Sequence, residues 1–131
     1  MPDPKLLETF PTPTDTPFTI EHVADEFTSK CPMTGHPDFG VVVVRFEPAP
    51  ASSGGTCVEL KSLKLYLQSF RDEGIFYEAV TNTIRDHLAE CMKPTWLVVR
   101  TEWRGRGGIR SNIVAAHGDA PEAECSRPSG Q

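Results

Sequence analysis

The sequence predicts an α+β domain, in which a four-stranded antiparallel sheet carries two helices on one face. Three stretches lead to this prediction. Residues 41–47 form a β-branched run typical of a strand. Apolar residues recur at helical spacing across residues 76–92, and residues 95–103 alternate between two faces as a strand does. The expected order is strand, strand, helix, helix, strand, strand.

The N-terminal part of the chain is predicted to be an extended arm. Residues 1–17 contain five prolines and few apolar side chains. We expect Leu6, Leu7 and Phe10 to pin this arm, which is otherwise loosely held. Residues 18–23 are either a short strand or a continuation of the arm.

The middle of the chain is predicted to hold a hairpin followed by two helices. Residues 41–47 and 56–60 are expected to pair as antiparallel strands across a flexible loop without core-forming side chains. Apolar residues at i, i+4 and i+7 predict a first helix, which stops at Gly74. The second helix, residues 76–92, ends before Pro94.

The last part of the chain is predicted to supply two more strands, residues 95–103 and 109–116, around a glycine-rich turn at 104–108. Residues 118–131 are small and polar and are expected to be a disordered tail, which leaves residues 18–117 as a single domain. Such a sheet has open edges and an uncovered face, so we expect the subunits of a homo-oligomer to cover them.

Composition limits the possible classes of function. The chain has 131 residues, enough for one hydrophobic core, and a formal net charge of -5 that does not attract nucleic acid in general. Lys61, Lys64 and Arg71 nevertheless cluster in the sequence. No apolar run has the length of a transmembrane helix and no signal-peptide pattern opens the chain, so we expect a cytoplasmic protein with reduced thiols. The four cysteines lack metal-ligand spacing, so no zinc site is expected.

One stretch, residues 27–40, holds Cys31, His36 and Asp38 close together. Prolines and a Thr-Gly pair break it into turns, so we expect neither a regular helix nor a strand there. A thiol with a lowered pKa is a nucleophile, and a carboxylic acid held nearby donates protons. This pair suits the addition of a thiol to an electrophilic carbon, followed by proton delivery. A capped turn without chemistry is the alternative.

Three further stretches carry candidate binding groups. Glu59 ends a predicted strand, and Lys61 and Lys64 share a helix face that either binds phosphate groups or is simply solvated. Glu78 opens the second helix, where it interacts with the helix dipole or accepts hydrogen bonds from a ring N–H pair of a heterocycle. The glycine-rich turn around Arg106 suits an anionic ligand, but a plain hairpin turn needs the same glycines.

Five motifs occur in order along the chain: Phe27-Thr-Ser-x-Cys-Pro-x-Thr-Gly-x-Pro-Asp-Phe39, Glu59-Leu-Lys-Ser-Leu-Lys-Leu-Tyr66, Ser69-Phe-Arg71, Phe76-Tyr-Glu78 and Arg106-Gly-Gly-Ile109. With them the chain resembles the NADPH-dependent 7-cyano-7-deazaguanine reductases, the nitrile reductases of queuosine biosynthesis, in their short single-module form. The match runs from Leu6 to about Gly118.

This resemblance implies a tunnelling fold, whose subunit sheets assemble into a β-barrel ring. Two stacked pentamers with active sites between subunits are expected. By similarity, Cys31 forms a covalent thioimide with the nitrile, Asp38 donates protons, and NADPH delivers hydride twice to give the aminomethyl base. The expected partners are this deazapurine nitrile and further copies of the chain, with no direct contact to nucleic acid, membrane or metal.

The resemblance also assigns the binding groups. Tyr77 and Glu78 are expected to grip the edge of the deazaguanine. The backbone alongside the base is expected to come from Val58, Glu59 and Leu60. The groups expected to hold the NADPH phosphates are Lys61, Lys64 and Arg106.

Three residues depart from the family pattern. Lys30 stands where an apolar residue is usual, and it favours the thiolate if it lies near the sulfur but does nothing if it points away. Tyr77 replaces a histidine common in part of the family, and it still hydrogen bonds and stacks. His36 stands where glutamine is frequent, and we assign it no role.

Three alternatives to a reductase are open. An amidine-forming relative adds ammonia to the same nitrile in tRNA, but it has no need of the nicotinamide site that the motif at residues 59–66 implies. A zinc enzyme of the same fold that handles pterins or purines needs a Cys/His ligand set that the sequence lacks. A non-catalytic binding module keeps Glu78 as its anchor and leaves Cys31 and Asp38 unexplained.

Overall fold

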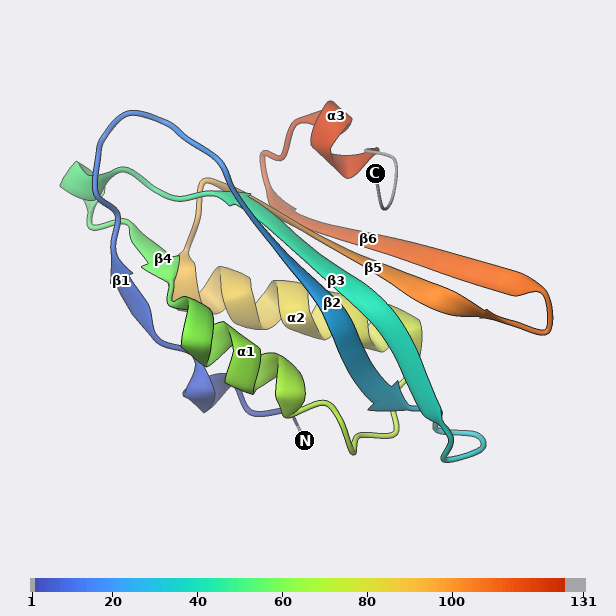
Figure 1. The fold of residues 1–131 in the computed structure, drawn as a ribbon. Helices are drawn as coiled ribbons and strands as arrows, with labels where there is room; N and C mark the ends of the chain where they lie inside the picture. The colour runs from blue at the N-terminus through green and yellow to red at the C-terminus, as the bar shows by residue number, and fades with distance from the viewer. Residues whose placement is uncertain (1, 127–131) are drawn as a thin grey trace.

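The computed structural model describes residues 2–126 and has the predicted α+β architecture. A four-stranded antiparallel sheet has the order β2-β3-β5-β6. Two helices, α1 (Leu60–Gln68) and α2 (Tyr77–Met92), lie on one face of it (Figure 1). The strands of this sheet are β2 (Ile20–Lys30), β3 (Pro37–Glu47), β5 (Trp96–Arg106) and β6 (Ile109–Gly118).

The predicted pairing of the first two strands is wrong. The β3 strand pairs with β2 on one side and with β5 on the other, so neither edge is free for residues 56–60. The stretch Thr56–Val58 forms a short strand, β4, which pairs instead with β1 (Thr9–Pro11) in a separate two-stranded sheet. A 3-10 turn, η2 (Ala51–Ser53), lies in the loop between β3 and β4.

The N-terminal arm is held more firmly than predicted. It contains a 3-10 turn, η1 (Pro4–Leu6), as well as β1. The backbone N–H of Glu8 donates to the Ser62 hydroxyl at 3.0 Å, and the N–H of Glu59 donates to the carbonyl of Glu8 at 2.8 Å. These hydrogen bonds fasten the arm to the start of α1. Leu6 and Leu7 pack against the core as expected, but Phe10 is 46% exposed, so its predicted role in pinning the arm is wrong.

The predicted disordered tail is wrong where the structure describes it. Residues 122–125 form a short helix, α3 (Glu122–Cys125), which follows β6. An ion pair joins the Glu124 carboxylate to the Arg45 guanidinium on the sheet. The remainder of that prediction, residues 127–131, lies outside the described residues.

Helix α2 begins and ends within one residue of its predicted bounds. Helix α1 differs: it begins at Leu60, inside the stretch 56–60 that was predicted to be a strand, and it ends at Gln68 instead of Gly74. Glu59 is the N-cap of α1, and its carboxylate accepts hydrogen bonds from the N–H groups of Lys61 and Ser62, each at 2.8 Å. The α2 helix ends at Lys93 in the left-handed region, with φ 49°, just before Pro94. The core between helices and sheet is made by the buried side chains of Val42, Val44, Phe46, Leu63, Leu67, Val80, Ile84, Leu88, Leu97 and Val99.

The hairpin of β5 and β6 is longer than predicted. Its turn consists of Gly107 and Gly108 alone, with φ of 59° and 80°, the two positive values that a two-residue turn of type I′ requires. The strand therefore continues to Arg106, and the hairpin projects beyond the helices (Figure 1). Arg106 Nη2 donates to the carbonyl of Pro37 at 2.8 Å, so this extension reaches the tip of the first hairpin.

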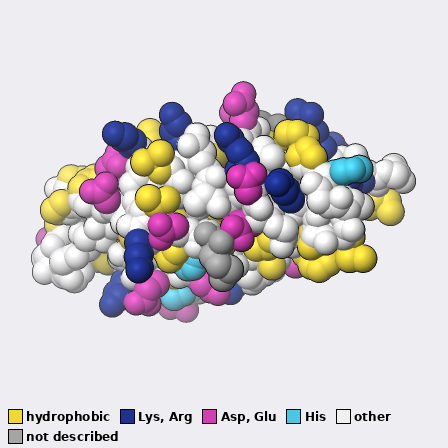
Figure 2. All heavy atoms as spheres, turned by 90° about the horizontal axis from the view of Figure 1, so that it is seen from below, with side chains coloured by type: hydrophobic (Ala, Val, Ile, Leu, Met, Phe, Trp, Pro, Cys, Tyr) yellow, Lys and Arg dark blue, Asp and Glu magenta, His cyan; other side chains and the backbone are white. Residues whose placement is uncertain are grey.

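Charges of both signs are interspersed on the face seen from below in Figure 2. Hydrophobic side chains gather there in small groups between them. Within residues 2–126, no helix combines the length and the apolar character needed to cross a bilayer.

A buried hydrogen bond joins the two helices. Tyr66 on α1 is fully buried, and its hydroxyl lies 2.6 Å from Nδ1 of His87 on α2. Burial raises the pKa of Tyr66, so the phenol stays protonated at neutral pH. Burial also lowers the pKa of His87, although the charge of Asp86 opposes that effect.

We predict that the free energy of unfolding falls as the pH decreases from about 7 to about 5. The pKa of His87 is lowered below its ordinary value of 6.5 in the folded state, so the unfolded chain binds more protons in this range. The decline should be shallower in His87→Gln, whose side-chain carbonyl can still accept from Tyr66. Denaturant titrations at one fixed protein concentration measure this, with His117→Gln on exposed β6 as the control. Equal slopes in all three proteins would contradict the prediction.

Candidate active site

Cys31 lies in a closed loop at the tip of the first hairpin. Residues 31–36 join β2 to β3, and the remaining parts of the stretch 27–40, predicted to be turns throughout, belong to the two strands. The N–H of Cys31 donates to the carbonyl of His36, and the N–H of Gly35 donates to the carbonyl of Cys31, both at 2.8 Å. Gly35 has φ 74°, a conformation that favours glycine. The loop thus holds the cysteine just beyond the last strand pair.

Groups within this loop lower the pKa of the Cys31 thiol. The Thr34 hydroxyl, followed by the backbone N–H groups of Met33 and Thr34, lowers the pKa of Cys31 by hydrogen bonding to the sulfur. Slight desolvation and the charge of Asp38 oppose this effect. Lys30 points to the Asp72 carboxylate, 3.5 Å away, and is not among the groups that lower the thiol pKa. Thr34 is therefore an activating residue that spacing alone did not single out.

Asp38 is buried beside this loop and is held by two side chains. It pairs across the hairpin with Ser29, and only 4% of it is exposed. The Arg106 guanidinium lies 2.8 Å from Asp38 Oδ1, and the Tyr77 hydroxyl donates to the same oxygen at 3.3 Å. The fully buried Ser29 hydroxyl, on the same face of the hairpin, has no hydrogen-bond partner among residues 2–126.

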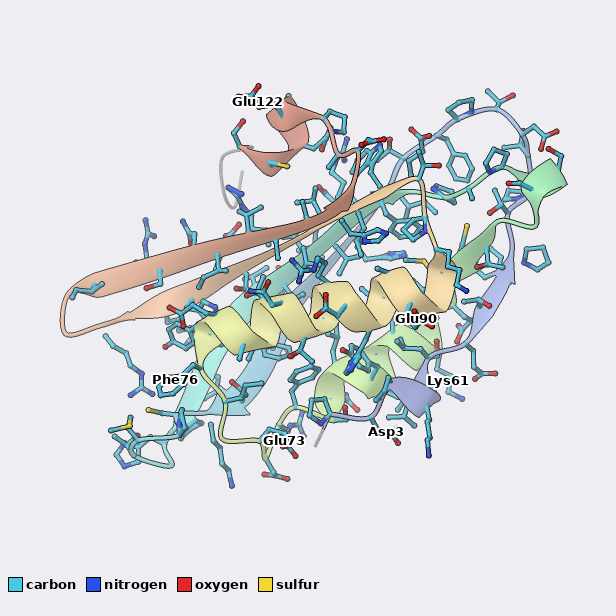
Figure 3. The ribbon with its side chains drawn as sticks, turned by 180° about the vertical axis from the view of Figure 1, so that it is seen from behind. Asp3, Lys61, Glu73, Phe76, Glu90 and Glu122 are labelled. Carbon is cyan, nitrogen blue, oxygen red and sulfur yellow. The ribbon has the colours of Figure 1, made fainter. Side chains whose placement is uncertain are left out.

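The start of α2 supplies the next wall of the site. The Tyr77 ring stacks on Trp103 of β5, with 4.0 Å between ring centroids and 8° between their planes. Burial and the neighbouring Asp38 raise the pKa of Tyr77, so its phenol is protonated and donates. Glu78 follows in the first turn and is exposed. Phe76, the N-cap residue, marks this end of α2 in Figure 3.

These groups surround a small cavity of about 190 Å³. Its lining residues are Cys31, Pro32, Asp38, Ile75, Phe76, Tyr77, Glu78 and Arg106. Five of the ten predicted site residues therefore meet here. The volume lies below the range of about 300–1,000 Å³ that is usual for small-molecule sites.

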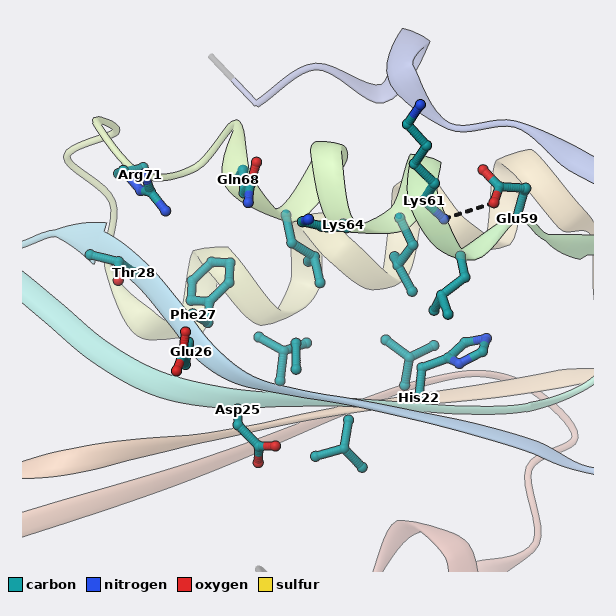
Figure 4. A pocket seen from close by; sticks show the side chains of 17 residues that line it. His22, Asp25, Glu26, Phe27, Thr28, Glu59, Lys61, Lys64, Gln68 and Arg71 are labelled. Atoms are coloured by element: carbon teal, nitrogen blue, oxygen red, sulfur yellow. Dashed lines mark hydrogen bonds between the residues drawn. The ribbon is translucent and has the colours of Figure 1, made fainter.

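A larger groove of about 820 Å³ lies between α1 and the edge strand β2. Figure 4 shows Lys61, Gln68 and Arg71 following one another along its helical wall, with Lys64 between them. All four side chains are exposed. Glu59 and Leu60 line the same groove, and His22 faces it from β2. No lining residue is common to this groove and the small cavity.

Two predicted residues lie elsewhere than expected. Val58 is buried and lines neither cavity, and its N–H donates to Met92 Sδ at 3.1 Å. Arg106, assigned to the NADPH phosphates with Lys61 and Lys64, contacts Asp38 in the small cavity instead of lining their groove. Its phosphate role stays a prediction. Among residues 2–126, no three His, Cys, Asp or Glu side chains form a group that could hold a metal.

We predict that Cys31 reacts faster with iodoacetamide at neutral pH than Cys91, because burial raises the pKa of Cys91. Thr34→Val should shift the pH dependence of Cys31 alkylation to higher pH, since it removes the hydroxyl that most lowers the thiol pKa. Thr34→Ser keeps that hydroxyl and should behave like the wild type. Mass spectrometry of quenched samples gives the rate at each cysteine.

The substitution Lys30→Met tests whether the Lys30 ammonium lowers the pKa of the Cys31 thiol. Because Lys30 pairs with Asp72, its loss should leave the pH dependence of Cys31 alkylation unchanged. A shift as large as that of Thr34→Val would show that the ammonium, rather than the hydroxyl, activates the thiol.

Known proteins share both the sequence and the fold. The sequence profile of the QueF-like protein family matches residues 37–122. A relative from Rhodopirellula baltica is 50% identical over 86% of this chain and 90% of its own length. Another from Prosthecochloris aestuarii is 48% identical over 91% of this chain and 98% of its own length. Both are named NADPH-dependent 7-cyano-7-deazaguanine reductase.

A solved structure shows the same fold at much lower sequence identity. The archaeosine synthase QueF-Like, in its apo form, superposes with a TM-score of 0.67 at 19% identity. The superposition covers 84% of this chain and 99% of that one. Because the family profile matches residues 37–122 and the relatives are about half identical over most of the chain, the chain belongs to the QueF-like protein family.

Proposed function

We propose that the protein is an NADPH-dependent nitrile oxidoreductase, which reduces 7-cyano-7-deazaguanine to the aminomethyl base in queuosine biosynthesis. One observation carries the proposal. An activated thiol, Cys31, and a buried carboxylic acid, Asp38, line the same cavity, in a chain about half identical to curated reductases of this nitrile. The relatives match this chain over most of their own length, which supports transfer of the whole activity.

Covalent capture is the first step of the proposed reaction. The Cys31 thiolate attacks the nitrile carbon, a C–S bond forms, and one π bond of the nitrile becomes a lone pair on nitrogen. That nitrogen takes a proton from Asp38, which gives a thioimide. The lowered pKa of Cys31 supports this role, because it raises the fraction of thiolate at neutral pH.

Two reductions complete the reaction. NADPH, when bound, supplies hydride to the former nitrile carbon. After the first hydride the C–S bond breaks and Cys31 is regenerated as thiolate, which leaves an imine. The second hydride and a proton convert the imine to the amine. Asp38 thus delivers protons repeatedly to the same nitrogen, and its burial at the edge of the cavity supports this task.

Recognition of the base is assigned to the start of α2. The exposed carboxylate of Glu78, at the rim of the cavity, suits a ring N–H and amino pair on one edge of a deazaguanine. The Tyr77 ring lies beside Glu78 and stacks on the Trp103 ring. The backbone of Val58, Glu59 and Leu60 is assigned to the same base, but from a neighbouring subunit, because these residues lie outside the small cavity of their own chain.

The groove along α1 fits the anionic part of NADPH. Lys61 and Lys64 are one helical turn apart, and Arg71 continues the row of cations into the following loop. This spacing suits several phosphates along an extended cofactor. The volume of about 820 Å³ also lies within the range of about 300–1,000 Å³ that is usual for ligand pockets.

We assign the active sites to the junctions between subunits of a ring, expected to be two stacked pentamers. The proposal is supported by the small volume of this cavity and by the position of two groups assigned to the cofactor, Lys61 and Lys64, which line a different surface. Four large hydrophobic side chains near the cavity are strongly exposed, and a neighbouring subunit would cover them. They are Met33, Phe39, Phe76 and Ile109.

The amidine-forming reaction is the alternative function within this fold. The solved relative is named an archaeosine synthase, but at 19% identity it supports the fold alone. The two reactions differ in their second reactant, which is ammonia in one and a hydride donor in the other. Conversion of the nitrile with ammonia, without oxidation of NADPH, would favour the alternative.

We predict that incubation with the nitrile in the absence of NADPH adds the mass of one nitrile molecule per chain, at Cys31. The adduct should be absent in Cys31→Ala and present in Cys91→Ala, whose thiol lies on the other end of α2. In Asp38→Asn some adduct should still form, with its proton taken from water, but reduction should fall by about a hundredfold or more because the proton donor is lost. Intact-mass spectra and NADPH absorbance measure the two steps. Wild-type protein without an adduct, or full turnover in Asp38→Asn, would contradict this mechanism.

We also predict that the double substitution Lys61→Ala with Lys64→Ala raises the KM for NADPH by about tenfold or more, through the loss of charge-assisted phosphate contacts. The KM for the nitrile should change much less. Lys5→Ala, at an exposed lysine of the N-terminal arm, is the control. Equal increases in both KM values would refute a phosphate-binding role for the groove.

A further inference from the structure

A chain of buried hydrogen bonds runs from β5 to the first turn of α2. Trp103 Nε1 donates to Thr101 Oγ1 at 2.8 Å. The Thr101 and Thr81 hydroxyl oxygens lie 2.6 Å apart, and the Thr81 hydroxyl donates to the carbonyl of Tyr77 at 2.9 Å. The Trp103, Thr101 and Thr81 side chains are at most 2% exposed.

The chemistry of these groups fixes the direction of the chain. An indole N–H only donates, a carbonyl only accepts, and each hydroxyl has a single proton. The protons therefore run from Trp103 to Thr101, from Thr101 to Thr81, and from Thr81 to the Tyr77 carbonyl. Every group in the chain is satisfied in this arrangement alone. A fully satisfied buried network is rigid.

Tyr77 is consequently held at two points. The network holds its backbone carbonyl, and the Trp103 ring stacks against its phenol ring. Trp103 is itself confined from two further sides. Its ring packs edge to face with Phe27, with 5.8 Å between the ring centroids. It also lies so close to Gly40 that a Cβ added to that glycine would be 2.9 Å from Trp103 Cε3.

Strand β5 also determines what surrounds the acid. Arg106, three residues beyond Trp103, contacts Asp38 directly, and Trp103 acts on Asp38 through Tyr77. Both contacts are made to Oδ1. Neither contact involves Oδ2, so we assign proton transfer to the substrate to that oxygen.

We propose that Trp103, with Thr101 and Thr81, is a positioning residue that sets the Tyr77 hydroxyl on Asp38 Oδ1 and so directs Oδ2 to the reacting nitrogen. This inference rests on the proposed function, because it concerns proton delivery during nitrile reduction. It gives Tyr77 a role toward the acid that is separate from gripping the base. Neither Trp103 nor the threonines touch the substrate.

The test compares two substitutions of Trp103. Trp103→Leu removes both the stack and the N–H donor, and it should lower kcat by about tenfold or more while the KM for NADPH stays within about twofold. Trp103→Phe keeps an aromatic ring under Tyr77 and should recover part of the loss. Formation of the Cys31 adduct without NADPH should persist in both variants. Phe70→Leu is the matched control, since Phe70 is equally buried in the same core but contacts Phe27 and Tyr66 instead of Tyr77.

A double-mutant cycle separates positioning from general destabilisation. Tyr77→Phe, which lacks the hydroxyl, should itself lower kcat, and adding Trp103→Leu to it should lower kcat little further. Full additivity, or a loss in Trp103→Leu no greater than in Phe70→Leu, would overturn the inference.

If Trp103→Leu does not fold, Thr101→Val interrupts the same network and should lower kcat several-fold. An unchanged kcat in Thr101→Val would overturn the inference equally. A wild-type protein that does not reduce the nitrile rejects the proposed function instead.

Discussion

The register between β2 and β3 is the constraint on which the site depends. Ser29 pairs with Asp38, so the acid points to the helix side of the sheet. The closed loop between β2 and β3 brings Cys31 next to it. A slip of one residue would turn Asp38 to the opposite face, because side chains alternate along a strand. Burial prevents that slip, since Val42, Val44 and Phe46 on the same strand are at most 1% exposed.

Two further segments of the chain converge on this hairpin tip. The extended hairpin of β5 and β6 brings Arg106, and the start of α2 brings Tyr77 and Glu78. Arg106 and Tyr77 contact the acid from within the same chain, whereas the cationic groove lies between α1 and β2. This separation explains why Arg106 and the two lysines, grouped by the resemblance, line different cavities.

Local patterns were sufficient for the α+β class, both helices, strands β5 and β6, and the neighbourhood of Cys31 and Asp38. Pairing partners were not predictable in the same way. Strand β2 is interrupted by a bulge between Ala24 and Phe27 and carries polar residues, so its period-two signal is weak, while the short β4 has an equally good strand composition. The contact of Tyr77 with Trp103 depends on how the helix lies on the sheet, which no local pattern records. The family resemblance, in contrast, was carried by ordered motifs and is confirmed by the relatives.

The stoichiometry of cofactor use tests the central claim most directly. Reduction of a nitrile to a primary amine takes two hydrides, so the account predicts two NADPH oxidised for each nitrile consumed, with the aminomethyl base as the product. NADPH absorbance and chromatography of the same reaction measure both quantities. Consumption of the nitrile without oxidation of NADPH, or with an amidine as the product, would contradict the account.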